Sequence, residues 1–430
     1  MTQPLWQKST TSINESMMQY MAGEDVILDR ELILYDIQAS IAHVMGLASI
    51  SLLTQPESQQ LIEQLKALAK AIKTGDFVLD NRFEDCHSAI EYWLIDKLGE
   101  LGKKVHTGRS RNDQILVATR LYLKDALQQV IALTRNSAES CLQKAKQGEA
   151  IAMPGYTHLQ QAVPSSVGMW FAGFAESMID NLISLKAALQ LVDANPLGTA
   201  AGYGVNLPLD RELTRQKLDF ERLQINPIYA QNSRGKFEIA TLNAMSLAML
   251  DIRRYCWDIS IFTTQEFAMV KLPAEMMTGS SIMPNKNNPD LVELMRASYS
   301  VVQSSIVELQ SLLSLPSGYQ RDLQLSKPAM LRGIKKVLDT FALFPALIEG
   351  TDFIAEACAA KMSAPMYATD LAIELSAQGV PFRTAYQQVA NSYDELEQRK
   401  PDDSLKARVS PGGCANLMLH ELEQRLMDLS

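Results

Sequence analysis

Two long stretches of this 430-residue chain, residues 109–147 and 236–272, contain neither glycine nor proline. Because these two residue types most often interrupt regular structure, each stretch can continue as a single element. In the first stretch, Leu116, Leu123 and Leu127 recur at spacings of seven and four, which is a helical period and not the alternation of a strand. At about 1.5 Å per residue, such a helix is more than about 50 Å long.

Three further segments have a helical pattern, and we predict long helices over 164–195, 289–315 and 328–363. Pro345 is expected to kink the last of these helices, because its ring removes an intrahelical hydrogen bond. Shorter helices are predicted over 29–48 and 56–74, nearer the N-terminus. Since no convincing run of alternating β-branched residues is present, the chain is predicted to be all-α.

The length of these helices favours a bundle, because strict heptads fail and no repeat of about 30 to 45 residues is visible. Residues 245–250 carry no charge, so that helix is expected to be buried on more than one side, and we expect oligomerisation through the bundle. The flanks are shorter and the C-terminal one is more charged. We therefore predict an N-terminal helical domain (1–110), a central five-helix bundle (111–363) and a C-terminal helical domain (364–430).

Composition excludes several classes of protein. The net charge of −9, from 40 basic and 49 acidic residues, argues against a broad basic surface for nucleic acid. The five cysteines are scattered and form no zinc-type spacing, so we expect no metal site, reduced thiols and a cytoplasmic location. The N-terminus lacks the pattern of a signal peptide, and no apolar run approaches about 18 residues, so no membrane segment is expected.

Four segments are unusually rich in small and polar residues: 83–87, 106–114, 154–160 and 278–290. In the last, glycine and two serines form a donor-rich loop, and Lys286 and Asn288 can bind a carboxylate. The same composition also suits a capped linker between two helices, and both interpretations remain open.

The other three segments are equally ambiguous on their own. His158 lies beside Thr157 after a glycine, and a single histidine is more often structural than catalytic. Around Ser110 and Asn112, the start of a long helix offers either a capping residue or an anion site. Residues 83–87 place a histidine beside carboxylates, a pattern also found in solvated turns.

Taken together, these segments resemble a known superfamily. Residues 279–289 fill every fixed position of the pattern Gly-Ser-Ser-x-x-Pro-x-Lys-x-Asn-Pro, which is the signature loop of the fumarase/aspartase superfamily. The segments 84–87, 107–114, 155–160 and 319–327 further resemble the argininosuccinate lyase family. The tail segments 368–371 and 379–383 are similar to the C-terminal domain of that family, so the match runs from about residue 25 to about residue 390.

The resemblance implies a fumarase/aspartase-like fold, a central long-helix bundle flanked by two smaller helical domains. It also implies a carbon–nitrogen lyase that cleaves argininosuccinate to arginine and fumarate by general acid/base β-elimination, in arginine biosynthesis. It assigns proton abstraction to Ser280, whose hydroxyl needs a neighbouring positive charge such as Lys286 to act as a base. It assigns protonation of the departing nitrogen to His158, oriented by Glu293, although binding of a substrate carboxylate is a second role for this histidine.

The same resemblance implies a set of substrate-binding positions. They are Asp85, His87, Ser110, Arg111, Asn112, Thr157, Asn288, Tyr319, Gln324 and Lys327. It further implies a homotetramer in which three subunits contribute to each active site. We predict no cofactor, since neither a dinucleotide-binding nor a phosphate-binding loop is present.

Several positions depart from the family pattern. Asp25 stands where the family has a serine, Asn285 and Asn287 replace other residues of the signature loop, and 6–10 and 232–236 also differ. These changes leave open another fumarate-releasing lyase that acts on a different N-succinyl compound. A non-enzymatic structural role, for which this fold has been recruited in the lens, is disfavoured because His158, Ser280 and Lys286 are all present.

Overall fold

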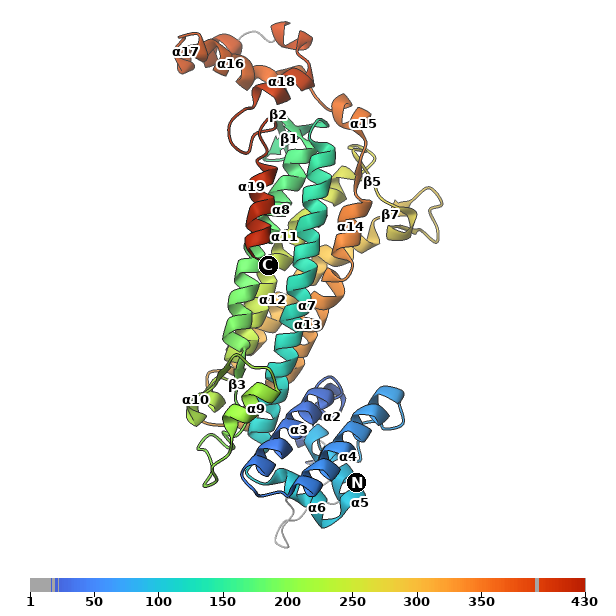
Figure 1. Ribbon diagram of the computed structural model, residues 1–430. Coiled ribbons are helices and arrows are strands. Elements are labelled where there is room, and N and C mark those ends of the chain that lie inside the picture. The colour runs from blue at the N-terminus through green and yellow to red at the C-terminus, as the bar shows by residue number, and fades with distance from the viewer. Residues whose placement is uncertain (1–16, 18–19, 22, 391–393, 430) are drawn as a thin grey trace. The chain divides into compact units, whose positions relative to one another are not determined.

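The computed structural model of the protein describes residues 17, 20–21, 23–390 and 394–429 (Figure 1). The departure noted at residues 6–10 lies outside the described residues. Over the described residues the chain is all-α, as predicted, apart from four short two-stranded pairings. None of the helices in this part of the chain combines the length and the apolar character needed to span a membrane.

The chain forms two compact units, and each unit is assembled from three separate stretches of sequence. Unit 1 comprises Met1–Gln129, Leu185–Ala244 and Val301–Lys336. Unit 2 comprises Val130–Ser184, Met245–Ser300 and Val337–Ser430. The division into three domains near residues 110 and 363 stays a prediction.

Five long helices contribute residues to both units. They are α7 (Arg111–Gly148), α8 (Val167–Val192), α11 (Lys236–Phe262), α12 (Asp290–Leu312) and α13 (Ser326–Phe341). In unit 1, a Cβ at Gly333 of α13 would lie 2.9 Å from Leu242 of α11 and 3.1 Å from Ser305 of α12. Glycine at this position therefore lets three helices approach closely.

The helix predicted over 236–272 is too long, because α11 ends at Phe262. The backbone N–H of Thr264 donates to the carbonyl oxygen of Ile261, three residues back, so the last turn tightens where the helix ends. Ala268 then adopts a φ of 49°, outside the helical region.

The single helix predicted over 328–363 is also wrong. Pro345 lies in the first turn of a new helix, α14 (Phe344–Gly350), after α13 has ended. This position suits proline, since its missing N–H has no intrahelical partner there. The ring therefore separates two helices and does not kink one, and β8 (Asp352–Phe353) and α15 (Ala355–Ala360) follow.

Unit 1 begins with a group of short helices, of which α3, α4 and α5 lie side by side (Figure 1). The group comprises α2 (Asp25–Leu28), α3 (Ile33–Ser49), α4 (Gln55–Thr74), α5 (Cys86–Leu98), α6 (Glu100–Lys103) and η1 (Lys104–His106). Ile37 and Val44 of α3, Leu61 and Leu65 of α4 and Leu94 of α5 share one buried apolar cluster. The helices predicted over 29–48 and 56–74 are confirmed, as α3 and α4.

A second buried cluster joins α3 to the start of α7. Ala39 and Ala42 of α3 pack with Val117 and Leu121 of α7 and with Phe220. The N-terminal end of α7 is thereby held beside the short helices. The remaining elements of unit 1 are β3 (Ala194–Asn195), α9 (Arg211–Lys217), β4 (Arg222–Leu223), α10 (Pro227–Asn232) and η3 (Arg321–Leu325).

Unit 2 contains an antiparallel hairpin, β1 (Ala152–Thr157) and β2 (Gln160–Ser166), between α7 and α8. Its core includes Trp170, whose ring centroid lies 4.9 to 6.1 Å from those of five other aromatic rings. The remaining elements are β5 (Val270–Lys271), η2 (Ala274–Met276), β6 (Thr278–Gly279), β7 (Asn287–Asn288), η4 (Ala364–Tyr367), α16 (Ala368–Ala377), α17 (Phe382–Ala390), η5 (Asp394–Gln398), α18 (Pro401–Ala407) and α19 (Leu419–Asp428).

Candidate active site

A polar pocket of about 220 Å³ lies in unit 1, and we call it the head pocket. Its lining includes seven of the ten predicted substrate-binding residues: Asp85, His87, Arg111, Asn112, Tyr319, Gln324 and Lys327. The other lining residues are Asp25, Asp29, Glu84, Ile115, Arg234 and Arg321. Segments far apart in the sequence therefore meet here, and their role in binding substrate stays a prediction.

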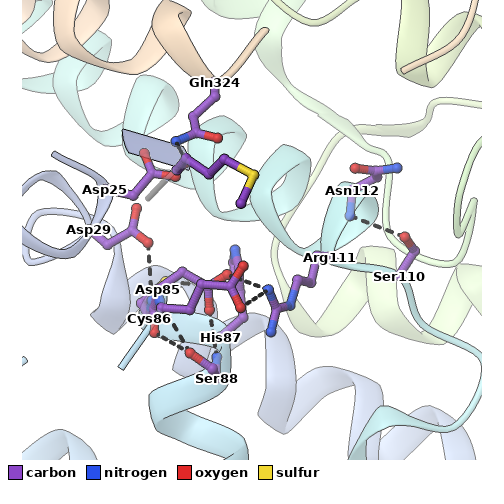
Figure 2. A network of polar contacts seen from close by, with 12 residues as sticks. Asp25, Asp29, Asp85, Cys86, His87, Ser88, Ser110, Arg111, Asn112 and Gln324 are labelled. Atoms are coloured by element: carbon purple, nitrogen blue, oxygen red, sulfur yellow. Dashed lines mark hydrogen bonds and ion pairs between the residues drawn. The ribbon is translucent and has the colours of Figure 1, made fainter. Parts of the chain in front are cut away.

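The first wall of the head pocket is the N-terminus of α5. Asp85 caps this helix, because its Oδ1 accepts a hydrogen bond from the backbone N–H of Ser88 at 2.7 Å. Arg111, from the first turn of α7, lies 3.0 Å from Glu84 and 3.2 Å from Asp85 (Figure 2). Burial disfavours a charge on Asp85, but His87, Arg111 and the capping bonds outweigh it and lower the pKa of this carboxyl.

Below this wall lies a buried chain of charges centred on Asp36. One carboxylate oxygen is 2.6 Å from Nδ1 of His87, and the other is 3.2 Å from Arg109, which also donates to Ser40 at 2.8 Å. Burial opposes ionisation of both partners, yet the pairing wins: the pKa of His87 is raised and that of Asp36 is lowered. His87 therefore holds its proton more tightly than a free histidine, and its ring lines the head pocket.

A second ion cluster surrounds Lys327, at the start of α13. Its ammonium group lies 3.0 Å from Asp25 and also pairs with Asp29, which in turn accepts a bond from the backbone N–H of Cys86 at 3.0 Å. Burial lowers the pKa of Lys327, but the charges of Asp29 and Asp25 raise it by more, so the net shift of the pKa is upward. Lys327 is thus a permanent cation that faces two carboxylates.

The start of α7 shows the capping contact that its sequence allowed, while the anion site stays a prediction. Ser110 Oγ accepts from the backbone N–H of Asn112 at 3.2 Å, which is a capping contact (Figure 2). Asp113 accepts from the backbone N–H of Ser110 at 2.9 Å and from those of Gly198 and Ala200 at 3.1 and 3.0 Å. These bonds fix the turn so that its Arg111 and Asn112 side chains line the head pocket.

The signature loop belongs to unit 2 and is closed at its base by two short strands. Thr278 pairs with Asn288 and Gly279 with Asn287, and the hydroxyl group of Thr278 donates to Asp290. Ser280 is half-buried, and its Oγ accepts from the backbone N–H of Met283 at 3.1 Å. Lys286 is exposed, and no described contact joins it to Ser280. Ser280 and Lys286 therefore lie on the same short loop, without a described contact between them.

His158 and Thr157 lie at the tip of the β1–β2 hairpin, also in unit 2. Thr157 pairs with Gln160, so His158 and Leu159 form a two-residue turn. Both turn residues have positive φ, 53° and 57°, which is unfavourable for any residue except glycine or asparagine. Both side chains are exposed. Strain of this kind is concentrated at functional sites.

Glu293 lies in the first turn of α12, and it forms a loose ion pair with Arg296 at 3.7 Å. Within the described part of unit 2, no contact joins it to His158. The orientation of His158 by Glu293 therefore stays a prediction.

Sequence reasoning missed several groups that form the head pocket or its support. Glu84 and Arg109 lie inside segments that were singled out, but no role was given to them. Asp29 and Asp36 carried no local signal, because each is a single charged residue in an otherwise ordinary segment, and Arg234 was noted only as part of the departure at 232–236. Asp25 was noted only as a departure.

Three buried side chains, Asp36, Cys86 and His87, could in principle share a metal ion, because their ligand atoms lie within 4.8 Å of one another. Their chemistry does not fit this role. Asp36 is already paired with His87 and Arg109, and burial raises the pKa of the Cys86 thiol well above its usual range. A neutral thiol is a poor metal ligand.

Comparison with known proteins places the chain in a family. A model of the lyase family matches residues 4–304. The argininosuccinate lyase of Xanthomonas oryzae pv. oryzae (strain PXO99A) is 54% identical over 426 residues, which cover 99% of each chain. The argininosuccinate lyase of Stenotrophomonas maltophilia (strain R551-3) is 53% identical over 427 residues, again 99% of each chain.

Solved structures share the fold at lower identity. An EDDS lyase in complex with formate has a TM-score of 0.82 at 22% identity, over 97% of this chain and 90% of that one. A class II fumarase from Schistosoma mansoni has a TM-score of 0.72 at 17% identity, over 87% of this chain and 90% of that one. These neighbours confirm the fumarase/aspartase-like fold. With relatives more than half identical along nearly its whole length, the chain belongs to the argininosuccinate lyase family.

Proposed function

We propose that this chain cleaves argininosuccinate to arginine and fumarate, as a carbon–nitrogen lyase of arginine biosynthesis. The observation that carries this proposal is the 54% identity to an argininosuccinate lyase over 99% of both chains. The head pocket supports it, because cations and carboxylates from five separate segments line one small cavity. Such a cavity suits a substrate that carries both charges.

The elimination needs a base and an acid at the two ends of the breaking bond. We assign the base to Ser280, which removes a proton from the carbon beside a succinyl carboxylate. The C–N electrons leave with the nitrogen of the guanidinium group, a C=C bond forms, and the nitrogen takes a proton from His158. Placed proton transfer of this kind is typically worth about 10²–10⁴-fold in rate.

Serine is a weak base, and its surroundings must favour the ionised form. The backbone N–H of Met283 already donates to Ser280 Oγ at 3.1 Å, and that bond becomes stronger on an anionic oxygen. Lys286, six residues further along the same loop, supplies positive charge when the loop closes over the substrate. Asn288 and Thr157 provide donors for the succinyl carboxylates.

The head pocket receives the arginine half in this scheme. Tyr319, Gln324 and Lys327 hold its amino-acid end, while Asp85 and His87 form the opposite wall. Ser110, Arg111 and Asn112 contribute the turn at the start of α7. These roles rest on the family resemblance together with the shared position of seven of the residues around one cavity.

We further propose a cytoplasmic homotetramer in which each active site takes residues from three subunits. Large apolar side chains exposed on α11 and α12, among them Leu247, Trp257, Leu294 and Val307, support this assembly. Mixing an inactive Ser280→Ala variant with an inactive Lys327→Met variant tests it. After joint refolding, hybrid tetramers should recover activity, since some sites then contain both natural residues. If no mixture recovers activity, the proposal that subunits share active sites is wrong.

The activity itself is tested by the ultraviolet absorbance of fumarate. Purified enzyme should release fumarate and arginine in equal amounts from argininosuccinate. A parallel panel of adenylosuccinate, aspartate and malate distinguishes the alternative, another fumarate-releasing lyase, for which the departures at Asp25, Asn285 and Asn287 leave room. Absence of fumarate from every compound would favour a non-enzymatic role.

A further inference from the structure

Asp25 distinguishes the head pocket of this chain from the family pattern, which has a serine there. It lies in the short helix α2, and its side chain is 18% exposed. Its Oδ1 accepts a hydrogen bond from Lys327 at 3.0 Å. Among the described residues, no donor other than Lys327 bonds to this carboxylate, so Oδ2 keeps its capacity to accept.

The charges around Lys327 do not cancel. One ammonium group faces two carboxylates, Asp25 and Asp29, and this corner of the head pocket therefore carries an excess of negative charge. The guanidinium group of Arg234 also lines the pocket and lies 5.7 Å from the centre of the Tyr319 ring. The cavity thus offers both carboxylates and cations to a ligand.

We propose that Asp25 binds the α-ammonium group of the arginine half and thereby makes the enzyme select substrates with a free α-amine. The inference rests on the proposed function, because argininosuccinate supplies that ammonium group. An N-acylated substrate has no cation to offer this corner, and its acyl group would have to occupy the place of the ammonium–carboxylate contact.

Asp25 is the carboxylate of the head pocket best suited to this task. Asp29 is fully buried and already bonds to Lys327 and to the backbone of Cys86. Asp85 caps α5 and pairs with Arg111. Glu84 also pairs with Arg111. Asp25 is partly exposed. Its partner Lys327 also pairs with Asp29, so Lys327 keeps a counter-charge when Asp25 binds a ligand.

Other donors of the head pocket complete the recognition of an amino acid. Arg234 and the amide of Gln324 suit the α-carboxylate, and Gln324 is already oriented by a bond that its amide donates to the backbone carbonyl of Met21 at 2.9 Å. An α-amino acid carries its two charges on neighbouring atoms. A cavity of about 220 Å³ that is lined by both carboxylates and cations matches this arrangement.

The experiment measures binding of the product side without turnover. Calorimetry gives the dissociation constants of L-arginine and of 5-guanidinopentanoate, which is arginine without its α-amine. Natural enzyme should bind arginine about 10- to 100-fold more tightly, the range expected for a hydrogen bond between charged groups. Asp25→Asn, which keeps the shape and removes the charge, should reduce this preference to less than about threefold and leave the affinity for 5-guanidinopentanoate unchanged.

Two controls keep the test decisive. Glu24→Gln removes the same charge from the exposed neighbouring residue and should preserve the preference. Nα-acetylarginine should bind the natural enzyme no better than 5-guanidinopentanoate does. Equal affinity of the natural enzyme for arginine and 5-guanidinopentanoate would overturn the inference without any variant. An unchanged preference in folded Asp25→Asn would do the same.

Failure of this inference is distinguishable from failure of the proposed function. If natural enzyme releases fumarate from argininosuccinate but shows no preference for the α-amine, only the role of Asp25 is lost. If no fumarate is released while the preference persists, the pocket binds an amino acid and the proposed reaction is wrong.

Discussion

The head pocket and the signature loop differ in how their polar side chains are surrounded. In the head pocket, His87, Lys327 and Arg111 are each paired with carboxylates, and the first two are buried. In unit 2, Lys286, His158 and Glu293 are exposed, and Ser280 bonds only to the backbone among the described residues. The proposed binding groups are thus fixed by ion pairs within the protein, whereas the proposed catalytic groups lie on an exposed loop and turn.

This difference has a physical origin. A buried charge requires a partner at all times, because its desolvation is costly. A group that must change its protonation state during each turnover cannot be tied so firmly to one partner. The predictions below test this contrast, beginning with the side chain whose loss should affect the reaction most.

Replacement of Ser280 by alanine should lower kcat by about 10⁴-fold, the upper range for removal of an acid–base group, with little change in the affinity for arginine. Steady-state fumarate release and calorimetry give the two quantities. Ser281→Ala is the matched control in the same loop, and its kcat should fall by less than about tenfold. Equal losses in both variants would remove Ser280 as the base.

His158→Gln should lower kcat by about 10²–10³-fold and flatten the pH dependence of kcat on the side where the acid loses its proton. The pH profile is the measurement that matters, since glutamine can bind a carboxylate but cannot donate a proton at neutral pH. A raised KM with an unchanged pH profile would show that His158 mainly binds the substrate.

His87→Asn tests the buried side of the comparison, where stability should respond. Removing one partner of a buried ion pair costs about 3–5 kcal/mol, so the variant should unfold at lower denaturant concentration. The raised pKa of His87 sets the sign with pH: its contribution is complete below the unfolded pKa of about 6.5 and is lost as pH rises through the folded pKa.

The stability difference between natural enzyme and His87→Asn should therefore shrink from pH 6 to pH 9 in urea unfolding curves. The exposed Glu24→Gln variant, which lies outside this cluster, should show no such trend. A difference that grows with pH would mean that His87 is neutral when buried.

The smallest effect is expected at the base of the signature loop. Thr278→Val removes the hydrogen bond to Asp290 but keeps the shape of the side chain. A single exposed hydrogen bond contributes about 0.5–1.5 kcal/mol, so kcat should fall by about two- to tenfold. A loss as large as that of Ser280→Ala would show that the loop is rigid before substrate binds, which would contradict the contrast drawn above.

The sequence alone predicted the long helices well where glycine or proline marked their ends, as at Gly148 for α7. It failed at α11, which ends within a run free of both residue types, where the backbone N–H of Thr264 bonds to Ile261, three residues back. Such a change in backbone bonding is not reported by residue periodicity. Pro345 was recognised, but its place in a first turn and not in a helix interior could not be read from the pattern.

The site shows the same division. The motifs identified Asp85, Arg111 and Lys327, which meet in the head pocket. They did not identify Asp29, whose partner Lys327 is 298 positions away, or Asp36, whose partner Arg109 is 73 positions away. A pairing over such distances exists only after folding, and each residue by itself resembles any other acidic residue on a helix.

The turn at His158 and Leu159 has a consequence for how this protein could change over generations. Two left-handed residues other than glycine cost about 1–2 kcal/mol each, and Asn-Gly would relieve most of that cost. A population selected for heat resistance alone would therefore be expected to drift toward Asn-Gly at this turn and to give up the imidazole. If His158 has the proposed role, folding stability at this turn stays below the value that Asn-Gly would give, because the reaction needs the imidazole.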